Sequence, residues 1–215
     1  ATTDSIVMLS ADMRQLCRGY TGTDGIGSGG DNNVDFTITS NCTLTWNYQT
    51  QYTFEVINPG GYDSPVPPEG EQWYDEGDTI TAYVTSPSGT HICIGYYGTG
   101  SLPSVSPYDS VPFYIYSPTT IQWRWALLSD VVSLTVNSPD DAGDPFPNGT
   151  TYWTIGSTVE AYVTSPWFDS YPDGIRDSCT GFSGTGSAPS SGTSDSVSFV
   201  INENSTLDWN WQRQY

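Results

Sequence analysis

The chain has 215 residues, contains no lysine and has a single histidine, His91. Its five basic residues are all arginine and stand against 24 acidic residues, which gives a formal net charge of −19. A surface this acidic repels the phosphates of nucleic acids and the headgroups of anionic membranes. No stretch approaches the ~20 apolar residues that a membrane-spanning helix needs. We therefore expect no nucleic-acid partner and no membrane insertion.

The sequence is also poor in the residues that favour helices, namely Ala, Leu, Lys and Glu. It contains instead 22 Gly, 15 Pro, 15 Tyr and 8 Trp, together with abundant Thr, Ser and Val, which suit short strands and turns. Aromatic residues make up 14% of the chain, so small modules have enough apolar surface for a core. The composition predicts an all-β protein and argues against intrinsic disorder.

Few residues offer catalytic chemistry. A Ser-His-Asp or Cys-His device would have to use His91, and no nucleophile elbow is present. The four cysteines form no Cys-x-x-Cys pair, so no zinc set or redox motif is formed with the one histidine. We expect a protein that is not an enzyme.

Internal repetition is the strongest signal in the sequence. Residues 52–130 and 131–215 share Ala-Tyr-Val-Thr-Ser-Pro, a Cys-x-Gly-aromatic block and a closing Trp-x-Trp, within segments that alternate apolar and polar residues. Residues 1–51 match the later blocks only, as an incomplete copy that lacks the first strand. The sequence predicts tandem small antiparallel β modules of β-sandwich or β-grasp-like type: two full copies plus an incomplete N-terminal copy.

A module that lacks one strand exposes an unpaired sheet edge, which proteins cover or use to pair with another chain. We therefore expect a homo-oligomer in which strand complementation at residues 1–51 makes a head-to-tail contact.

The blocks resemble the divergent internalin-type B-repeat, a family of bacterial surface modules strung in tandem within large exported proteins. The resemblance rests on Cys-x-Gly-aromatic-x-Gly-Thr-Gly-Ser-x-Pro at Cys93 and Cys179, on Ser-Val-x-Phe-x-Ile and on the closing Trp-x-Trp, and spans essentially the whole chain. It implies a compact, mainly antiparallel β module in an extracellular stalk, adhesin or fibre. It implies no catalytic residues.

Two acidic clusters are candidate Ca²⁺ sites, because this ion prefers hard oxygen ligands. Neither has the register of an EF-hand loop, and solvated acidic turns are the alternative. We expect no other cofactor. The clusters are formed by Asp75, Glu76 and Asp78 and by Asp140, Asp141 and Asp144.

The closing tryptophans lie two residues apart, so both rings of a pair fall on one face of a strand. They could form a flat platform for stacking sugars, but apolar residues recur beside them and favour a core role. The residues assigned to this core motif are Trp46, Trp123, Trp125, Trp209 and Trp211.

The second full copy carries a longer loop before its cysteine, and loops of this kind carry functions that differ between copies. Its aromatic residues Trp167, Phe168 and Tyr171 are candidates for an exposed contact with a glycan or another copy.

Cys17, Cys93 and Cys179 occupy one equivalent position in the three copies, so only Cys42 is extra. A Cys17–Cys42 disulfide bracing the incomplete copy is the natural pairing. Cys93 and Cys179 would then be buried thiols or cross-links to neighbouring subunits.

Two functions remain. The first is a secreted structural protein, a subunit or segment of a self-assembling fibre or stalk at the cell surface. The alternative is an extracellular adhesin that binds carbohydrates or another surface.

Overall fold

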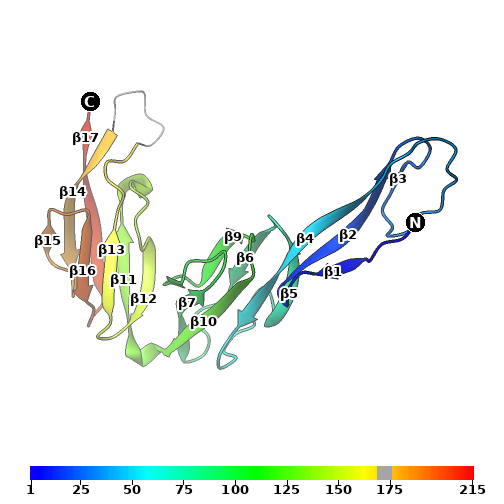
Figure 1. Cartoon of the computed structure of the whole chain (residues 1–215). Helices are drawn as coiled ribbons and strands as arrows, with labels where there is room; N and C mark the ends of the chain where they lie inside the picture. Colours follow the sequence, from blue (N-terminus) through cyan, green and yellow to red (C-terminus); the bar gives the residue numbers. More distant parts are fainter. Residues whose placement is uncertain (169–175) are drawn as a thin grey trace. The chain divides into compact units, whose positions relative to one another are not determined.

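The structure is a computed structural model and describes residues 1–168 and 176–215. Within these residues it contains strands and two short 3-10 turns, η1 (Leu128–Asp130) and η2 (Pro139–Asp141), but no α-helix (Figure 1). The prediction of an all-β protein is confirmed. In the described part of the chain, no helix is long and apolar enough to cross a bilayer.

The chain forms two compact units. The first contains Ala1–Val84, Tyr97–Ser106 and Ser110–Gln122. The second contains Thr85–Tyr96, Pro107–Asp109 and Trp123–Tyr215.

Unit 1 is organised around one long strand, β4 (Leu44–Ile57). The first half of β4 pairs antiparallel with β2 (Met13–Gly22), and its second half pairs antiparallel with β5 (Gly70–Asp75). The second half also pairs parallel with β10 (Thr119–Leu127). Because β4 runs unbroken through residues 51 and 52, the end of one predicted copy and the start of the next are a single strand.

Shorter strands complete this part of the fold. The eight-stranded sheet follows the path β1-β2-β4-β10-β7-β8, with β3 on β2 and β5 on β4, and a separate ladder joins β6 to β9. The additional strands are β1 (Ile6–Met8), β3 (Ser28–Gly29), β6 (Thr79–Tyr83), β7 (His91–Gly98), β8 (Val105–Ser106) and β9 (Ser110–Tyr114).

Unit 2 contains a five-stranded sheet in the order β12-β11-β17-β14-β15 and a two-stranded ladder of β13 and β16. Its strands are β11 (Val131–Asn137), β12 (Gly149–Thr154), β13 (Thr158–Tyr162), β14 (Arg176–Thr185), β15 (Ser191–Gly192), β16 (Ser196–Val200) and β17 (Ser205–Gln214).

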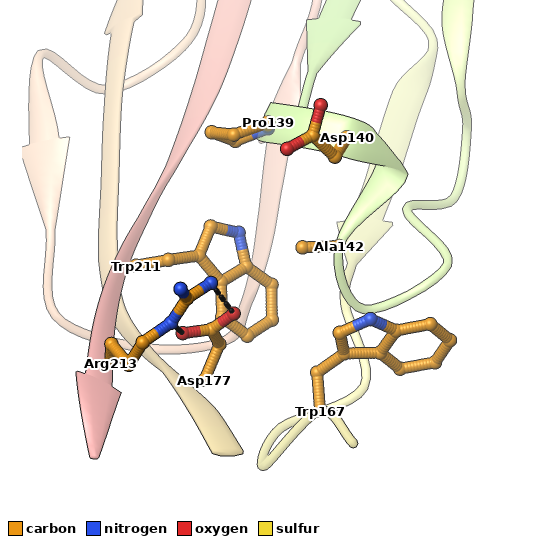
Figure 2. A pocket seen from close by; sticks show the side chains of 7 residues that line it. All are labelled: Pro139, Asp140, Ala142, Trp167, Asp177, Trp211 and Arg213. Atoms are coloured by element: carbon orange, nitrogen blue, oxygen red, sulfur yellow. Dashed lines mark hydrogen bonds and ion pairs between the residues drawn. The ribbon is translucent and has the colours of Figure 1, made fainter. Parts of the chain in front are cut away.

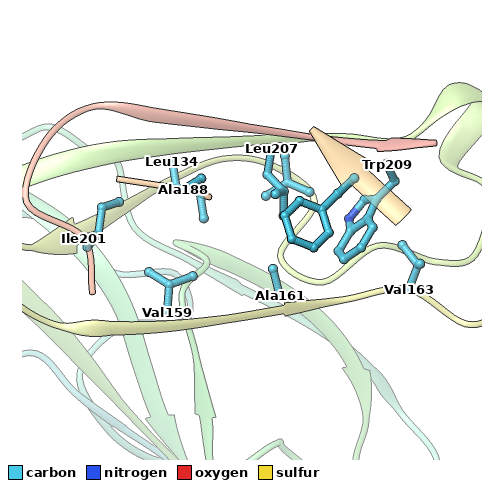
Figure 3. Packing of buried hydrophobic residues seen from close by; sticks show 10 residues of the cluster. Leu134, Val159, Ala161, Val163, Ala188, Ile201, Leu207 and Trp209 are labelled. Atoms are coloured by element: carbon cyan, nitrogen blue, oxygen red, sulfur yellow. The ribbon is translucent and has the colours of Figure 1, made fainter. Parts of the chain in front are cut away.

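The core of unit 2 lies between the five-stranded sheet and β13. Figure 3 shows Leu134 and Leu207 of the sheet facing Val159 and Ala161 of β13. Alternate residues of β13 and of the first half of β17 are buried, as expected for strands with one face on a core. Burial of these side chains stabilises the unit by about 25 cal/mol for each Å² of apolar surface removed from water.

The sheets are mixed, whereas the sequence predicted antiparallel modules. β4 is parallel to β10 and β11 is parallel to β17, with Leu134 opposite Ser205. A parallel neighbour needs a long crossover connection. Here the crossover consists of all the strands between the two partners. Local turn signals indicate only hairpins, so they could not predict the parallel pairing.

A glycine bulge interrupts the pairing of β2 with β4 and of β14 with β17. The register shifts between Cys17 and Tyr20 and again between Cys179 and Gly181. Gly181 has φ 125° and lies so close to the backbone of Gly192 that a Cβ would overlap its carbonyl oxygen. Only glycine combines this backbone conformation with such a close approach.

Replacing Gly181 with alanine should destabilise unit 2 by about 1–3 kcal/mol from backbone strain alone, before the steric clash is added. Urea unfolding measures the change. Ser183→Ala is the matched control, because Ser183 is exposed on the same strand, and it should change stability by less than about 0.5 kcal/mol. Equal stability of the two variants would contradict the assigned role of the bulge.

Candidate functional site

The same cysteine–glycine arrangement occurs at three places in the chain. The thiol of Cys93 donates to the carbonyl oxygen of Gly95 at 3.4 Å. Cys17 and Cys179 make the same contact with the glycine two residues ahead, at 3.6 Å to Gly19 and 3.5 Å to Gly181. Each glycine has a positive φ. At Cys17 and Cys179 this contact coincides with the register shift in the strand pairing.

An edge-to-face pair of aromatic rings accompanies each of the three cysteine–glycine contacts. The ring centroids lie 5.7 Å apart for Tyr20 and Trp46, 5.7 Å for Tyr96 and Trp123, and 5.6 Å for Phe182 and Trp209. Such pairs contribute about 0.5–1.5 kcal/mol beyond the burial of their area.

The tryptophans of the core motif differ in burial. Trp123 and Trp209 are buried, whereas Trp46, Trp125 and Trp211 are half-buried. The two buried rings are unable to serve as a platform for sugars, because their faces are covered by the core.

The N-terminal part of unit 1 has an open position beside residues 35–39. Val34 exchanges backbone hydrogen bonds with Ala1, at 2.9 Å and 2.7 Å. The matching pairs are Ala82 with Val111 and Ala161 with Val197, and there the ladder continues to Ile80 with Phe113 and to Val159 with Phe199. Among the described residues, no strand continues the ladder beyond Val34, whose partner Ala1 is the first residue of the sequence.

The consequence is an apolar side chain in water. Ile38 is 72% exposed, whereas the isoleucines at the matching positions, Ile115 and Ile201, are 0% exposed. Phe36 is half-buried, as is its counterpart Phe199, while Phe113 is 8% exposed. We call residues 34–38 the open segment; Val34 is paired with Ala1, whereas residues 35–38 pair with no strand in the described part of the chain.

A pocket of about 350 Å³ lies within unit 2 (Figure 2). The indole nitrogen of Trp211 donates to the hydroxyl of Ser138 at 2.9 Å, which fixes one wall. Arg213 forms a two-pronged ion pair with Asp177, at 3.2 Å and 3.4 Å. The lining residues are Pro139, Asp140, Ala142, Trp167, Asp177, Trp211 and Arg213.

The residues of the predicted contact loop differ in their exposure. Trp167 is half-buried, lines the pocket and pairs with the backbone of Asp177. Phe168 is 68% exposed. Tyr171 lies outside the described residues.

The carboxylate of Asp75, a predicted Ca²⁺ ligand, is hydrogen-bonded to side chains of two other strands. Its carboxylate accepts hydrogen bonds from Arg18 and from the side chain of Gln51, each at 2.7 Å, and Gln51 accepts from Arg14 at 2.8 Å. Asp78 accepts from the backbone of Asp75 at 3.0 Å. Asp75 therefore links strands β2, β4 and β5.

The second acidic cluster is also dispersed. Asp140, Asp141 and Asp144 each have a positive φ in the turn around η2, and Asp141 accepts a hydrogen bond from Asn148. Across residues 1–168 and 176–215, no three acidic, histidine or cysteine side chains lie close enough to hold a metal ion. Ca²⁺ binding at Asp75, Glu76 and Asp78 and at Asp140, Asp141 and Asp144 stays a prediction.

The predicted Cys17–Cys42 disulfide is not present, since all four cysteines are free thiols. Cys17 lies opposite Tyr48, whereas Leu44, next but one to Cys42, lies opposite Gly22. At about 3.3 Å per residue along a strand, this register separates the two cysteines beyond the ~7 Å that a disulfide spans between Cα atoms.

Burial raises the pKa of Cys93 to about 11, and it also raises the pKa of Cys179. A nearby carboxylate, Asp109 or Asp195, disfavours the thiolate further. His91, the first residue of β7, shares a hydrogen bond of 3.2 Å with the hydroxyl of Thr90.

Sequence reasoning missed Asp177 and Arg213 as pocket residues. They lie in different strands and meet only because β14 and β17 are paired, with Asp177 directly opposite Arg213. The one available signal was that Arg213 is among only five basic residues.

No family model matches the sequence, and no curated protein or solved structure is similar to it. The resemblance to the internalin-type B-repeat therefore stays a prediction.

Alkylation of the native protein should leave Cys93 unmodified long after Cys42 has reacted. Cys93 is 3% exposed, and with a pKa of about 11 only about one thiol in a thousand is ionised at pH 8. Its reaction should accelerate as the pH rises towards 11. Mass spectrometry of iodoacetamide-treated protein checks both points, and a Cys17–Cys42 cross-linked peptide would contradict the structure.

Proposed function

We propose that the chain is an extracellular structural protein of tandem β modules, a subunit or segment of a self-assembling surface fibre or stalk. The finer division into modules is supported by the cysteine–glycine contact and the aromatic pair, which recur with nearly the same geometry at Cys17, Cys93 and Cys179. In this reading the repeated residues are scaffolding, and no catalytic role is assigned to them.

The observation that carries the proposal is the open segment. Ile38 occupies the same position in its copy as Ile115 and Ile201 do in theirs. Those two side chains are completely buried, whereas Ile38 is 72% exposed. Full burial of one such side chain is worth about 1.5–3 kcal/mol, and pairing an open ladder adds backbone hydrogen bonds. Residues 34–38 thus form a surface suited to an added strand.

We assign this surface to a second copy of the chain. Unit 2 offers two outer strands, β12 and β15, each with one hydrogen-bonded neighbour in the described sheet, and β12 is the longer. A contact between the open segment of one copy and an outer strand of the next joins two different surfaces. Repetition of such a heterologous contact gives an open filament unless the rotation closes a ring.

Charge sets a condition on this assembly. Each copy carries a formal charge of −19, so copies repel one another at low ionic strength. Salt shortens the range of that repulsion to about 8 Å at 0.15 M and about 3 Å at 1 M. Association through apolar side chains and backbone pairing should therefore strengthen as salt is added.

Light scattering and negative-stain microscopy of the full chain test the proposal. The native chain should form filaments or oligomers that increase with protein concentration and with salt. Ile38→Asp should weaken association at least about tenfold, because it places a charge where about 1.5–3 kcal/mol of burial is expected.

Val105→Asp is the matched control. Val105 is also an exposed aliphatic residue of unit 1, at 52%, but it lies outside the open segment, so this variant should assemble like the native chain. A native chain that remains monomeric at high concentration and high salt would reject the assembly proposal and favour the alternative, an adhesin that acts as a monomer.

A further inference from the structure

The incomplete N-terminal module has a second exposed surface, at residues 42–45. Leu44 is half-buried, whereas Leu207, which occupies the same position in the second full copy, is 0% exposed. Cys42 is half-buried as well, while its counterpart Ser205 is 3% exposed. Water therefore reaches side chains that a complete module buries.

The strand that carries these residues is shorter at this end than its counterparts. β17 begins at Ser205 and β10 begins at Thr119, but β4 begins only at Leu44, two residues after the matching position Cys42. β17 and β10 each have a parallel neighbour at this end, namely β11 and the second half of β4. In the described part of the chain, residues 44–49 of β4 pair only with β2. The lack of a parallel neighbour accounts for both the late start of β4 and the exposure of Leu44.

Unit 2 shows which strand fills this position in a complete module. Leu134 and Val136 of β11 lie opposite Ser205 and Leu207, and they are 0% and 1% exposed. Both belong to the apolar cluster that also contains Leu207 and Ile201 (Figure 3). The occupant is thus a strand that runs parallel to β17 and directs aliphatic side chains into the core.

Unit 1 repeats this arrangement with different side chains. Phe54 and Val56 lie opposite Thr119 and Ile121, and they are 0% and 2% exposed. In both units an apolar residue therefore stands at every second position of the parallel strand, with a polar residue between. This shared pattern defines the chemistry of a segment that would fit beside residues 42–45.

One added strand would cover both exposed apolar side chains of the incomplete module. Ile38 and Leu44 correspond to Ile201 and Leu207, which share one cluster with Leu134 of the parallel strand. A strand placed beside residues 42–45 as β11 is placed beside residues 205–208 would bring its apolar side chains to Ile38 and Leu44. Full burial of one such side chain is worth about 1.5–3 kcal/mol.

We infer that Ile38, Cys42 and Leu44 form a docking site for an extended segment of a partner polypeptide, which runs parallel to β4 and has the alternating apolar pattern of β11. This mode of recognition is the addition of a strand to an exposed sheet edge. The inference rests on the incomplete module of the proposed function, and it adds the direction and the sequence pattern of the incoming strand. It does not require that the chain assembles with itself.

Saturation-transfer NMR tests the inference, with an excess of a peptide of the β11 sequence, Val131–Asn137, over the dilute full chain. The peptide should bind with a Kd of about 1 mM or lower, because burial of its Leu and Val side chains contributes about 1.5–3 kcal/mol each. A peptide of the same length with Leu134→Asp is the matched control. It should bind at least about tenfold more weakly.

A disulfide cross-link tests the direction and register of the bound peptide. A peptide with Leu134→Cys should form a disulfide with Cys42, because Leu134 lies opposite Ser205 in unit 2 and neighbouring strands are ~4.8 Å apart, within the span of a disulfide. Oxidised glutathione supplies the oxidant: two thiols form the cross-link and one glutathione disulfide is reduced to two thiols. A peptide with Asn137→Cys carries its thiol about 10 Å further along and should cross-link at least about tenfold more slowly.

A variant of the protein tests the docking site itself. Ile38→Asp should weaken peptide binding at least about tenfold, and the 72% exposure of Ile38 makes the substitution a small risk to folding. Thr37→Asp is the matched control, because Thr37 is the adjacent exposed residue and its counterpart Val200 is 50% exposed even in a complete module. It should leave the Kd of the peptide unchanged.

Three results would overturn the inference: no saturation transfer to the native-sequence peptide, equal binding of the Leu134→Asp peptide, or faster cross-linking of the Asn137→Cys peptide. A chain that binds the peptide but stays monomeric at high concentration and high salt would reject the assembly proposal alone. A chain that forms filaments but does not bind the peptide would reject this inference alone.

Discussion

The fold depends on one recurring local arrangement. A glycine bulge in one strand is followed by an aromatic residue, and the ring of that residue packs edge-to-face against a tryptophan of the neighbouring strand. At Gly181 the bulge needs a positive φ and a close approach to Gly192, which leaves no room for a side chain. Phe182 then follows the bulge and turns inward against Trp209, at the centre of the core of unit 2. The motif that dominates the sequence is thus a device for packing, and functional residues have to be sought outside it.

Much of the fold could be predicted from the sequence because strands with one buried face alternate in polarity. Alternation identified the all-β class and the core positions Trp123 and Trp209, which are buried. The parallel pairing of β11 with β17 could not be read from local patterns, because it depends on the path of all the strands between them. Mixed sheets therefore replace the antiparallel modules that hairpin signals suggested.

The candidate sites were harder to predict because side-chain partners depend on register. Matching the repeats left Cys42 as the extra cysteine and suggested Cys17 as its partner, but the register of β2 on β4 separates the two along the strands. Asp75 lies in an acidic run of the sequence, yet its carboxylate accepts a hydrogen bond from Arg18, which lies far from it in the sequence, on β2. The longer loop of the second copy drew attention to Trp167. Its charged neighbours in the pocket, Asp177 and Arg213, are brought together by the pairing of β14 with β17, which local patterns do not reveal.

The proposal on which the assembly depends is that a second copy of the chain covers residues 35–38. Hydrogen–deuterium exchange of this segment, followed from dilute to concentrated protein, tests it most directly, because unpaired backbone amides exchange rapidly and paired ones slowly. The account predicts that the amides around Phe36 and Ile38 become protected as concentration rises, while those of β17 are protected throughout. Rapid exchange of residues 35–38 at every concentration, with β17 still protected, would contradict it.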